Sequence, residues 1–433
     1  MTFAGLFVPA ELERAVGDEA WVGAMLDAER ALAAAEAQAG VVPHAAAESI
    51  AAACRSGRFD AVALAAAARA TGNPAEPLVR ALREQVGGEA ATYVHWGATS
   101  QDVVDTAAML VSRRALALIG ADLDAVAALV AGLARTYRDT PMAARTLLQQ
   151  AVPTTFGCKG AGWLVAVLHA RRRLAAVADG LPAQLGGAAG TLAPLGDAAL
   201  EVLGLYAAEL DLAEPPVPWQ ANRLVVAELG ATLSLAAGAL AKIALDVILL
   251  AQTEVGEVAE AGAGGSSTMP QKRNPTAAVL AGACARGVRG HAGVLAEAVV
   301  VEHERAAGAW QSEWSALSGA LALTGGAAAA VRRSLDGLQV DAERMRHNLD
   351  ATGGAILSER VVFHLARRDG REAALETLDG ARRRADERGT DLRRALAADL
   401  SAEELDELFD PLGYLGAAGA FVDRALALFA GGA

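Results

Sequence analysis

A helical repeat that begins after Asp105 constrains the fold more than any other feature of the sequence. Apolar and small residues recur there at alternating steps of three and four positions: Met109, Ser112, Leu116, Ile119, Leu123, Val126, Val130 and Leu133. This spacing is typical of the buried face of a long bundle helix, whereas a strand would alternate with a period of two. Leu224–Glu257 repeats the same rhythm. The sequence therefore predicts long helices that pack at about 20° to one another.

The composition agrees with a nearly all-α fold. The chain has 433 residues and is 53% hydrophobic but only 4% aromatic. Alanine and leucine, which form helices readily, dominate, and the residue types that mark strands are sparse. Further long helices are expected at about Thr155–Gly180, from Pro275 toward Gly290, and at about Gly308–Leu338. Shorter helices are expected at Ala10–Val16, Ala20–Ala39, Phe59–Ala70, Pro77–Val86, Arg360–Ala366, Arg371–Arg388, Leu392–Ala397 and Ala402–Leu408.

These patterns predict three helical domains. Residues 1–104 carry short helices, residues 105–350 the long central helices, and residues 351–433 shorter, charge-rich helices. A chain of this length exceeds one ordinary core. Its apolar content exceeds what the seam of one bundle needs, so we expect the long helices to associate with further copies of the chain. A single large monomeric core is the alternative.

Charge and cysteine content exclude several classes of protein. The net charge of −13 and the lack of a basic stripe argue against nucleic-acid binding, but a cationic pocket for a small anion is compatible with them. Three widely spaced cysteines indicate neither a disulfide framework nor a zinc site. No signal peptide is evident at the N-terminus. We therefore expect a cytoplasmic protein.

Mean hydropathy of +0.28 raises the question of membrane insertion. The longest uncharged helical stretches, Leu229–Ala241 and Trp314–Val331, are too short or are interrupted by polar and small residues. A membrane span needs roughly 20 predominantly apolar residues. These stretches are better interpreted as buried bundle helices, and no membrane association is expected.

Gly262–Pro275, with the sequence G-A-G-G-S-S-T-M-P-Q-K-R-N-P, differs from the rest of the chain. Its glycines permit close backbone approach to a ligand, and its prolines make a continuous helix unfavourable. Ser266 and Ser267 stand near its centre, and Lys272 and Asn274 near its end. The segment suits a lid that closes over an anion, but a Gly/Ser linker explains the composition as well. The Gly-Lys-Ser/Thr ending of a phosphate-binding P-loop is absent.

A polar segment, Tyr93–Thr106, precedes the first long helix. Thr99 and Ser100 are suited to cap that helix, whose N-terminus would favour a bound anion. Helix capping alone is the simpler reading, and for the two aspartates of this segment it is preferred over catalysis. His95 is a candidate for either ligand contact or a structural role.

Two further polar segments lie between apolar helices. Arg145–Gly157 groups an arginine, threonines and glutamines around one proline, which indicates either a ligand wall or an ordinary turn. Glu302–Trp314 is rich in charge and indole rings. Arg305 is its best candidate for a carboxylate ligand, because its planar fork matches a carboxylate bidentately. A surface ion-pair cluster is the alternative.

The motif G-G-S-S-T-M-P-Q-K-R-N-P resembles the signature of the fumarase/aspartase superfamily. H-W-G-A-T-S-Q-D, R-T-L-L-Q-Q-A-V-P-T-T-F-G and E-H-E-R-A-A-G-A-W-Q-S-E-W resemble most closely its bacterial 3-carboxy-cis,cis-muconate cycloisomerase branch. The similarity covers almost the whole chain. It implies an all-α, three-domain homotetramer with a central twenty-helix bundle. Each active site would combine segments of three subunits and bind a small di- or tricarboxylate, without cofactor or metal.

The resemblance also implies a reaction and the residues that perform it. Ser266 would be the base that removes the proton next to a carboxylate, with Lys272 stabilising its alkoxide and β-elimination following. His95 remains as the candidate acid, because Leu147 replaces the histidine that fumarases and adenylosuccinate lyases carry. The residues expected to bind substrate are Thr99, Ser100, Arg145, Thr146, Gln149, Thr154, Arg223, Ser267, Met269, Gln271, Asn274 and Arg305.

Three histidines of the cycloisomerase pattern are glutamines in this chain, at Gln220, Gln271 and Gln311. An amide neither titrates near pH 7 nor adds positive charge. A tricarboxylate would miss those charges. These departures favour the alternative, a lyase that releases fumarate from a substituted succinate of the nitrosuccinate or adenylosuccinate type, although muconate cycloisomerase remains the nearest relative. A non-enzymatic scaffold is disfavoured by the retained Ser266, Lys272, Asn274 and Arg305.

Overall fold

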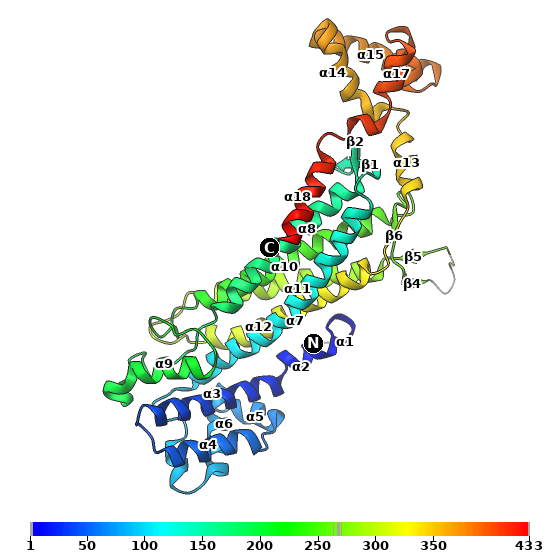
Figure 1. The fold of residues 1–433 in the computed structure, drawn as a ribbon. Coiled ribbons are helices and arrows are strands. Elements are labelled where there is room, and N and C mark those ends of the chain that lie inside the picture. The colour runs from blue at the N-terminus through cyan, green and yellow to red at the C-terminus, as the bar shows by residue number, and fades with distance from the viewer. Residues whose placement is uncertain (1–2, 263, 266–268, 270, 432–433) are drawn as a thin grey trace. The chain divides into compact units, whose positions relative to one another are not determined.

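The protein is described by a computed structural model that covers all residues except 1–2, 263, 266–268, 270 and 432–433 (Figure 1). Helices account for 70% of the chain, which confirms the predicted all-α class. Contacts group the residues into two compact units. Unit 1 comprises Met1–Asp124, Ala170–Ala241 and Leu280–Ala330; unit 2 comprises Ala125–His169, Lys242–Val279 and Val331–Ala433. The three-domain division stays a prediction.

Five long helices form the framework of the chain, and each contributes residues to both units. They are α7 (Ser100–Thr136), α8 (Phe156–Asp179), α10 (Leu224–Leu250), α11 (Thr276–Glu297) and α12 (Ala309–Leu335). The 3-4 repeat of α7 is buried from Met109 to Val130, and its last member, Leu133, is half-buried. Helix α10 ends seven residues before the predicted Glu257, and the turn that follows it includes Gly256, whose φ is 62°.

The start of unit 1 is a cluster of shorter helices. They are α1 (Ala4–Phe7), α2 (Ala10–Val16), α3 (Asp18–Gln38), α4 (His44–Ser56), α5 (Ala61–Ala68) and α6 (Ala75–Val86). The predicted helices are present, and α1 and α4 were missed. Helix α3 packs on α4 through Ala33, Ala37 and Ile50. Helix α9 (Ala199–Glu209) packs on the opposite part of α3, where Arg30 pairs with Glu209.

Gly325 and Gly326 lie within the continuous helix α12. A Cβ at Gly325 would lie 2.1 Å from Leu12 Cδ2, and one at Gly326 would lie 2.3 Å from the Phe7 carbonyl oxygen. The two glycines allow the N-terminal segment to lie directly on α12. Any larger residue would displace backbone at this contact.

Unit 2 contains strands that the sequence reading did not anticipate. The strands β1 (Pro141–Thr146) and β2 (Gln149–Thr155) form an antiparallel hairpin within the segment expected to be a turn or ligand wall. Two shorter ladders pair β3 (Val258–Ala259) with β6 (Gln339–Val340), and β4 (Gly264–Gly265) with β5 (Arg273–Asn274). The hairpin was missed because Arg145–Gly157 is polar and carries a proline, which are weak strand signals.

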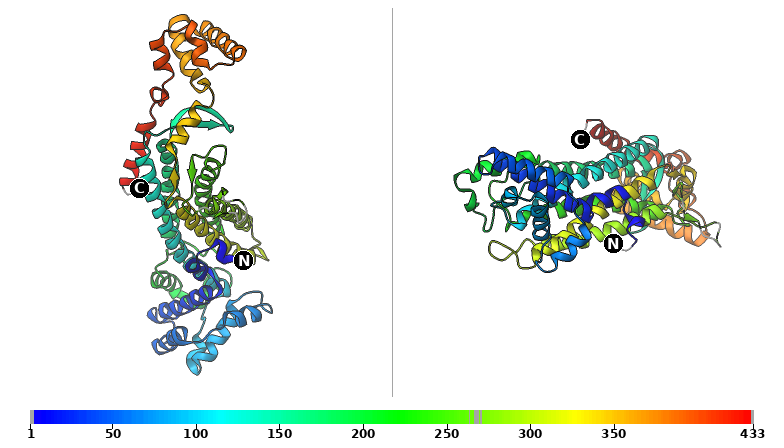
Figure 2. Two further views of the ribbon diagram at one scale, coloured as in Figure 1. Left: turned by 90° about the vertical axis from the view of Figure 1, so that its right-hand side faces the viewer. Right: turned by 90° about the horizontal axis from the view of Figure 1, so that it is seen from below.

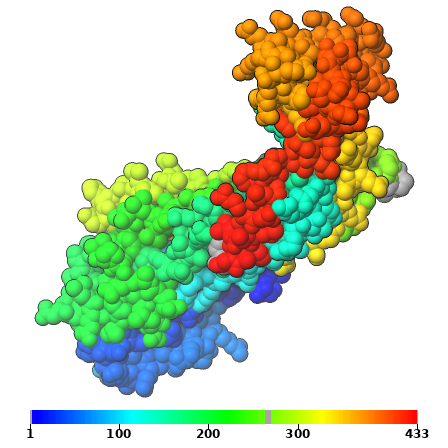
Figure 3. Space-filling view, turned by 45° about the horizontal axis from the view of Figure 1, so that its top comes forward, coloured from blue at the N-terminus to red at the C-terminus, as the bar shows by residue number. Residues whose placement is uncertain are grey.

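The remainder of unit 2 is helical. Its helices are α13 (Ala342–Asp350), α14 (Ser358–Asp369), α15 (Arg371–Arg388), α16 (Leu392–Ala395), α17 (Ala402–Leu408) and α18 (Ala418–Ala430). Helices α14 and α15 lie side by side over a leucine- and alanine-rich core (Figure 2). Helix α18 lies against the chain that follows α7, where Arg138 pairs with Asp423 (Figure 3).

The length argument against membrane spans was wrong. Three helices, α7, α10 and α12, are long and apolar enough to cross a membrane by length and composition. In α12, 72% of the most apolar window is buried within the chain, but in α7 and α10 the buried shares are only 44% and 50%. The remaining apolar surface of α7 and α10 is left uncovered by this single chain.

Candidate active site

Thr99 and Ser100 stand at the N-terminus of α7, as the sequence predicted. The backbone N–H of Thr99 donates to Asp102 Oδ2 at 3.0 Å, so Asp102 closes the first turn of the helix. The Asp102 carboxylate also accepts hydrogen bonds from the N–H groups of Gly186 and Gly187, each at 2.9 Å. Its burial raises its pKa to about 6, although these hydrogen bonds oppose the shift.

Arg305 lies directly beside Thr99. Its Nη1 donates to Thr99 Oγ1 at 2.9 Å, and its Nη2 donates to the carbonyl oxygens of Ala188 at 3.1 Å and Gly187 at 3.4 Å. The guanidinium has no acidic partner among the described residues, which argues against the ion-pair-cluster reading. Arg305 therefore keeps its positive charge available next to the α7 N-terminus.

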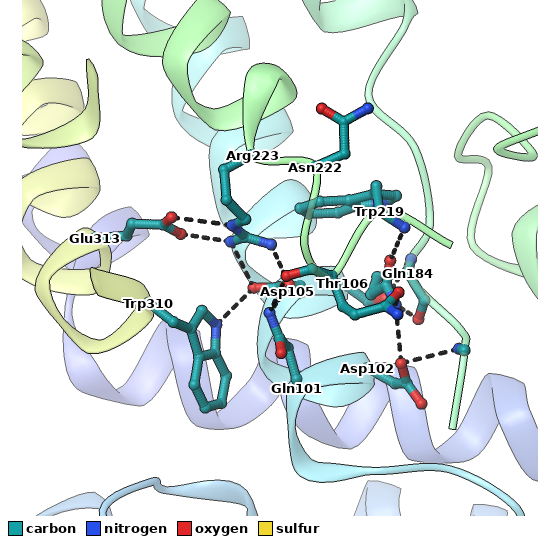
Figure 4. A network of polar contacts seen from close by, with 12 residues as sticks. Gln101, Asp102, Asp105, Thr106, Gln184, Trp219, Asn222, Arg223, Trp310 and Glu313 are labelled. Atoms are coloured by element: carbon teal, nitrogen blue, oxygen red, sulfur yellow. Dashed lines mark hydrogen bonds and ion pairs between the residues drawn. The ribbon is translucent and has the colours of Figure 1, made fainter. Parts of the chain in front are cut away.

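Arg223, predicted to bind substrate, is held instead in a buried acidic clamp (Figure 4). Its Nη1 and Nη2 donate to Asp105 at 2.6 and 3.0 Å, and its Nε donates to Glu313 Oε1 at 2.9 Å. The side chain of Arg223 is 1% exposed. Trp310 Nε1 also donates to Asp105, at 2.8 Å. Because two carboxylates already surround the guanidinium in the interior, this geometry argues against a direct substrate contact and for a structural role.

Gln184 and Gln101 extend this clamp toward Asp102 (Figure 4). Gln101 Nε2 donates to Asp105 Oδ2 at 3.1 Å and to the Gln220 carbonyl at 3.0 Å. Gln184 Nε2 donates to Asp102 Oδ1 at 3.0 Å. A single buried network thus joins the start of α12 to the start of α7 and to the glycine-rich segment on which Arg305 rests. It fixes the mutual position of Thr99 and Arg305.

His95 begins the five-residue stretch that leads to Thr99. Its Nδ1 lies 2.6 Å from Glu29 Oε1 of α3, and its φ is 61°, in the left-handed region. Burial alone would lower the pKa of His95, but the Glu29 carboxylate outweighs burial and raises it above the usual 6.5. Glu29 is 1% exposed.

The β1–β2 hairpin presents Thr146 and Gln149 as an exposed pair flanking its tip. The two tip residues, Leu147 and Leu148, have φ values of 51° and 66° and are 96% and 76% exposed. Two consecutive left-handed residues are the mark of a tight hairpin turn, which usually selects Asn-Gly. Thr154 lies at the other end of the hairpin, half-buried and opposite Met142.

Arg145, also predicted to bind substrate, forms a bidentate ion pair with Glu257 at 2.9 and 2.7 Å. The Glu257 side chain is fully buried, whereas that of Arg145 is 23% exposed. Asn348 Nδ2 donates to the same carboxylate at 2.8 Å. Arg145 therefore anchors the hairpin to the segment that precedes β3, and its charge is largely neutralised by Glu257.

The lid candidate Gly262–Pro275 is closed at its base by the β4–β5 ladder, so it is not a simple linker. Ser266 and Ser267 lie outside the described residues. Lys272, Met269 and Gln271 are exposed, and Asn274 is half-buried. Lys272 has no acidic partner within the described part of the chain.

The buried side chain of Glu260 lies where the lid candidate joins α11. Its carboxylate accepts hydrogen bonds from the N–H groups of Ala277 and Ala278, at 3.0 and 2.9 Å, and so caps α11. A carboxylate is favoured at a helix N-terminus by the helix dipole. The helix that follows the lid candidate therefore starts at a defined point.

Sequence reasoning missed Glu29, Glu257 and Gln184. Glu29 did carry a signal, because it and Glu36 stand seven residues apart on the otherwise apolar buried face of α3. Acidic residues on such a face are rarely there without a partner or a role. Glu257 and Gln184 carried no comparable signal. Among the described residues, no cluster of three His, Cys, Asp or Glu side chains is suited to hold a metal ion.

An all-α chain in which the guanidinium of Arg305 lies beside Thr99 at the N-terminus of α7 is compatible with the carboxylate lyase that the sequence resemblance implies. A family model described as "Lyase" matches residues 11–290, and one described as "Adenylosuccinate lyase C-terminus" matches residues 354–425. The chain belongs to this lyase family, within the fumarase/aspartase superfamily, and is an enzyme of the cycloisomerase and lyase group.

Relatives of known name span essentially the whole chain. Nitrosuccinate lyase of Streptomyces davaonensis is 51% identical over 98% of this chain and 94% of its own. The 3-carboxy-cis,cis-muconate cycloisomerase of Bradyrhizobium diazoefficiens is 47% identical, over 98% of this chain and 97% of its own. The crystal structure of 3-carboxy-cis,cis-muconate lactonizing enzyme from Pseudomonas putida superposes with a TM-score of 0.93 at 43% identity, covering 99% of this chain and 98% of that chain.

Proposed function

We propose that this enzyme is a β-elimination lyase that releases fumarate from a substituted succinate, with a good leaving group of the nitrosuccinate type. The observation that carries this proposal is the charge balance of the expected substrate ligands. Arg145 is paired with Glu257, and Arg223 with two further acids. Of the four cations expected around substrate, Lys272 and Arg305 are the two with no acidic partner among the described residues. Two cations match a dicarboxylate better than a tricarboxylate.

The chemistry follows from the named residues. Ser266, as the base, takes the proton from the carbon next to one carboxylate, and the C–H electron pair becomes the new double bond. The leaving group departs from the adjacent carbon with its bonding electrons. Negative charge that builds on the carboxylate is stabilised by cations and oriented N–H groups, for which Lys272 and Arg305 are available.

The assembly that we propose is a cytoplasmic homotetramer that binds neither nucleic acid nor membrane. The partly uncovered apolar faces of α7 and α10 support self-association. Each active site would take the Thr99 and Arg305 group, the β1–β2 hairpin and the lid from three different subunits. The proposal implies no cofactor.

Muconate cycloisomerase is the second candidate, favoured by relatives of that name at 47% identity. The nitrosuccinate lyase at 51% identity favours the first. Both reactions use a base next to a carboxylate and differ in the number of carboxylates that must be bound.

The test is to incubate the purified enzyme separately with nitrosuccinate, adenylosuccinate, argininosuccinate and 3-carboxymuconate. Fumarate absorbance should appear with nitrosuccinate, together with nitrite in equal amount, and muconate absorbance should persist. Loss of muconate absorbance without fumarate formation from any succinate would overturn the proposal in favour of the cycloisomerase. Ser266→Ala protein serves as the blank.

A further inference from the structure

The contact between His95 and Glu29 joins the polar segment before α7 to the buried face of α3. Glu29 lies in the middle of α3, surrounded by alanines, and His95 lies 66 residues further on, with its Nδ1 2.6 Å from Glu29 Oε1. A buried carboxylate is costly unless it is paired with a cation or donor. The other oxygen, Glu29 Oε2, is buried and has no hydrogen-bond partner among the described residues. The contact with His95 therefore offsets most of the cost of burying the Glu29 carboxylate.

The backbone at His95 indicates that the imidazole is held in a required position. A φ of 61° in a residue other than glycine is uncommon and is retained where the surroundings impose it. Because Nδ1 faces Glu29, Nε2 is left without a partner among the described residues. The side chain is 14% exposed, which is enough for one edge to meet a ligand.

The charges around His95 come from three helices. Glu29 acts from α3 and Asp102 from α7, and both raise the pKa of His95, whereas Arg83 from α6 lowers it. Glu29 is the only one of the three in direct hydrogen-bond contact. The carboxylate favours a proton on Nδ1 and so fixes which nitrogen is presented outward.

We propose that Glu29 is a positioning residue that holds His95 by Nδ1, so that the Nε2–H of the imidazolium serves as the general acid toward the leaving group. This inference rests on the proposed function. When the C–X bond breaks, the bonding pair leaves with X and the Nε2 proton passes to X. The imidazole becomes neutral and retains its Nδ1–H, which stays bonded to Glu29.

Glu36 offers a matched control on the same helix. It is fully buried seven residues after Glu29, and burial followed by the nearby Glu29 charge raises its pKa to about 9. It is therefore neutral at pH 7 and has no hydrogen-bond contact with His95. Glu36→Gln changes a buried carboxyl in α3 without changing the charge next to the imidazole.

The first measurement needs no substrate. Hydrogen–deuterium exchange at the imidazole C2, followed residue by residue with mass spectrometry, reports the titration midpoint of His95. Glu29→Gln should lower this midpoint by about one pH unit or more, since a carboxylate in contact shifts a pKa by about 1 to 3 units. Glu36→Gln should leave it unchanged, and Glu29→Asp should restore part of the difference. An unmoved midpoint in Glu29→Gln would overturn the inference.

The second measurement is the kcat and pH profile on the fumarate-releasing substrate. Glu29→Gln should lower kcat by about 10- to 100-fold, within the range of general-acid contributions, and shift the basic limb of the profile to lower pH. The double variant His95→Asn/Glu29→Gln should have the same kcat as His95→Asn alone. If Glu29→Gln lowered kcat as much in the His95→Asn protein as it does in the wild-type protein, the positioning role would be refuted. A shifted His95 midpoint in an enzyme that turns over no succinate would refute the proposed function while supporting the contact.

Discussion

Asp105 receives both terminal nitrogens of Arg223, at 2.6 and 3.0 Å, across 118 positions of the chain. Glu313 meets the same guanidinium from α12, so one cation joins three segments in the interior. This clamp gives Arg223 a structural role in the buried interior of the protein.

Arg223→Met should lower the free energy of unfolding by about 3–5 kcal/mol, because it leaves two carboxylates buried without their cation. Urea denaturation would measure the loss. Arg58→Met, at an exposed position outside any ion pair of the described residues, is the control and should be neutral. A loss below about 1 kcal/mol for Arg223→Met would contradict the assigned role.

Asp102 should make stability depend on acidic pH. Its folded pKa, about 6, lies above the ordinary 3.8, so the unfolded chain releases the proton first as pH rises. The free energy of unfolding therefore carries the full contribution below pH 3.8 and loses it between about pH 4 and 6, by up to about 3 kcal/mol. Urea midpoints at pH 4 and 7 should differ less in Asp102→Asn. Equal pH dependence of both proteins would refute the shift.

Arg305→Met should raise KM for the dicarboxylate about 10- to 100-fold, because a charge-assisted hydrogen bond contributes about 1.5–3 kcal/mol. Arg305→Lys should be intermediate, since it keeps the charge but loses the fork. Steady-state kinetics would measure both. If Arg305→Lys keeps the wild-type KM, the fork geometry with Thr99 has no part in binding.

Ser266→Ala should lower kcat by about 10²- to 10⁴-fold with little change in substrate affinity, as expected for removal of a base. Single-turnover kinetics and equilibrium binding separate the two effects. Ser49→Ala, an exposed hydroxyl bonded only to its own helix, is the matched control. Near-normal turnover of Ser266→Ala would remove serine as the base.

Leu235 and Leu245 should be buried between subunits. Each is about half-exposed in the single chain, at 49% and 51%, on one face of α10. If the proposed tetramer forms through this face, glutamate at both positions should convert it into smaller species in analytical ultracentrifugation. Val62→Glu, at an equally apolar but 75% exposed position of α5, should stay tetrameric. Tetramers of the double variant would contradict the assigned interface.

Local spacing was enough to predict most helices, since periodicity reports directly which face of a helix is buried. The bounds of α2, α15 and α17 agree with the prediction to the residue. The hairpin β1–β2 was not predicted because its strands are polar and contain a proline, and its anchoring contacts to Glu257 and Asn348 come from residues about 100 and 200 positions away.

The sequence by itself determined the all-α class and the family, because these reside in periodicity and in contiguous motifs. Which cations remain free was decided only by the tertiary structure. Arg145, Arg223 and Arg305 are the same residue type, but the first two pair with buried acids, whereas Arg305 pairs with no acid within the described part of the chain. Whether the charge of an arginine is available to a substrate depends on its partners in space. Those partners come from distant segments that no local sequence pattern connects.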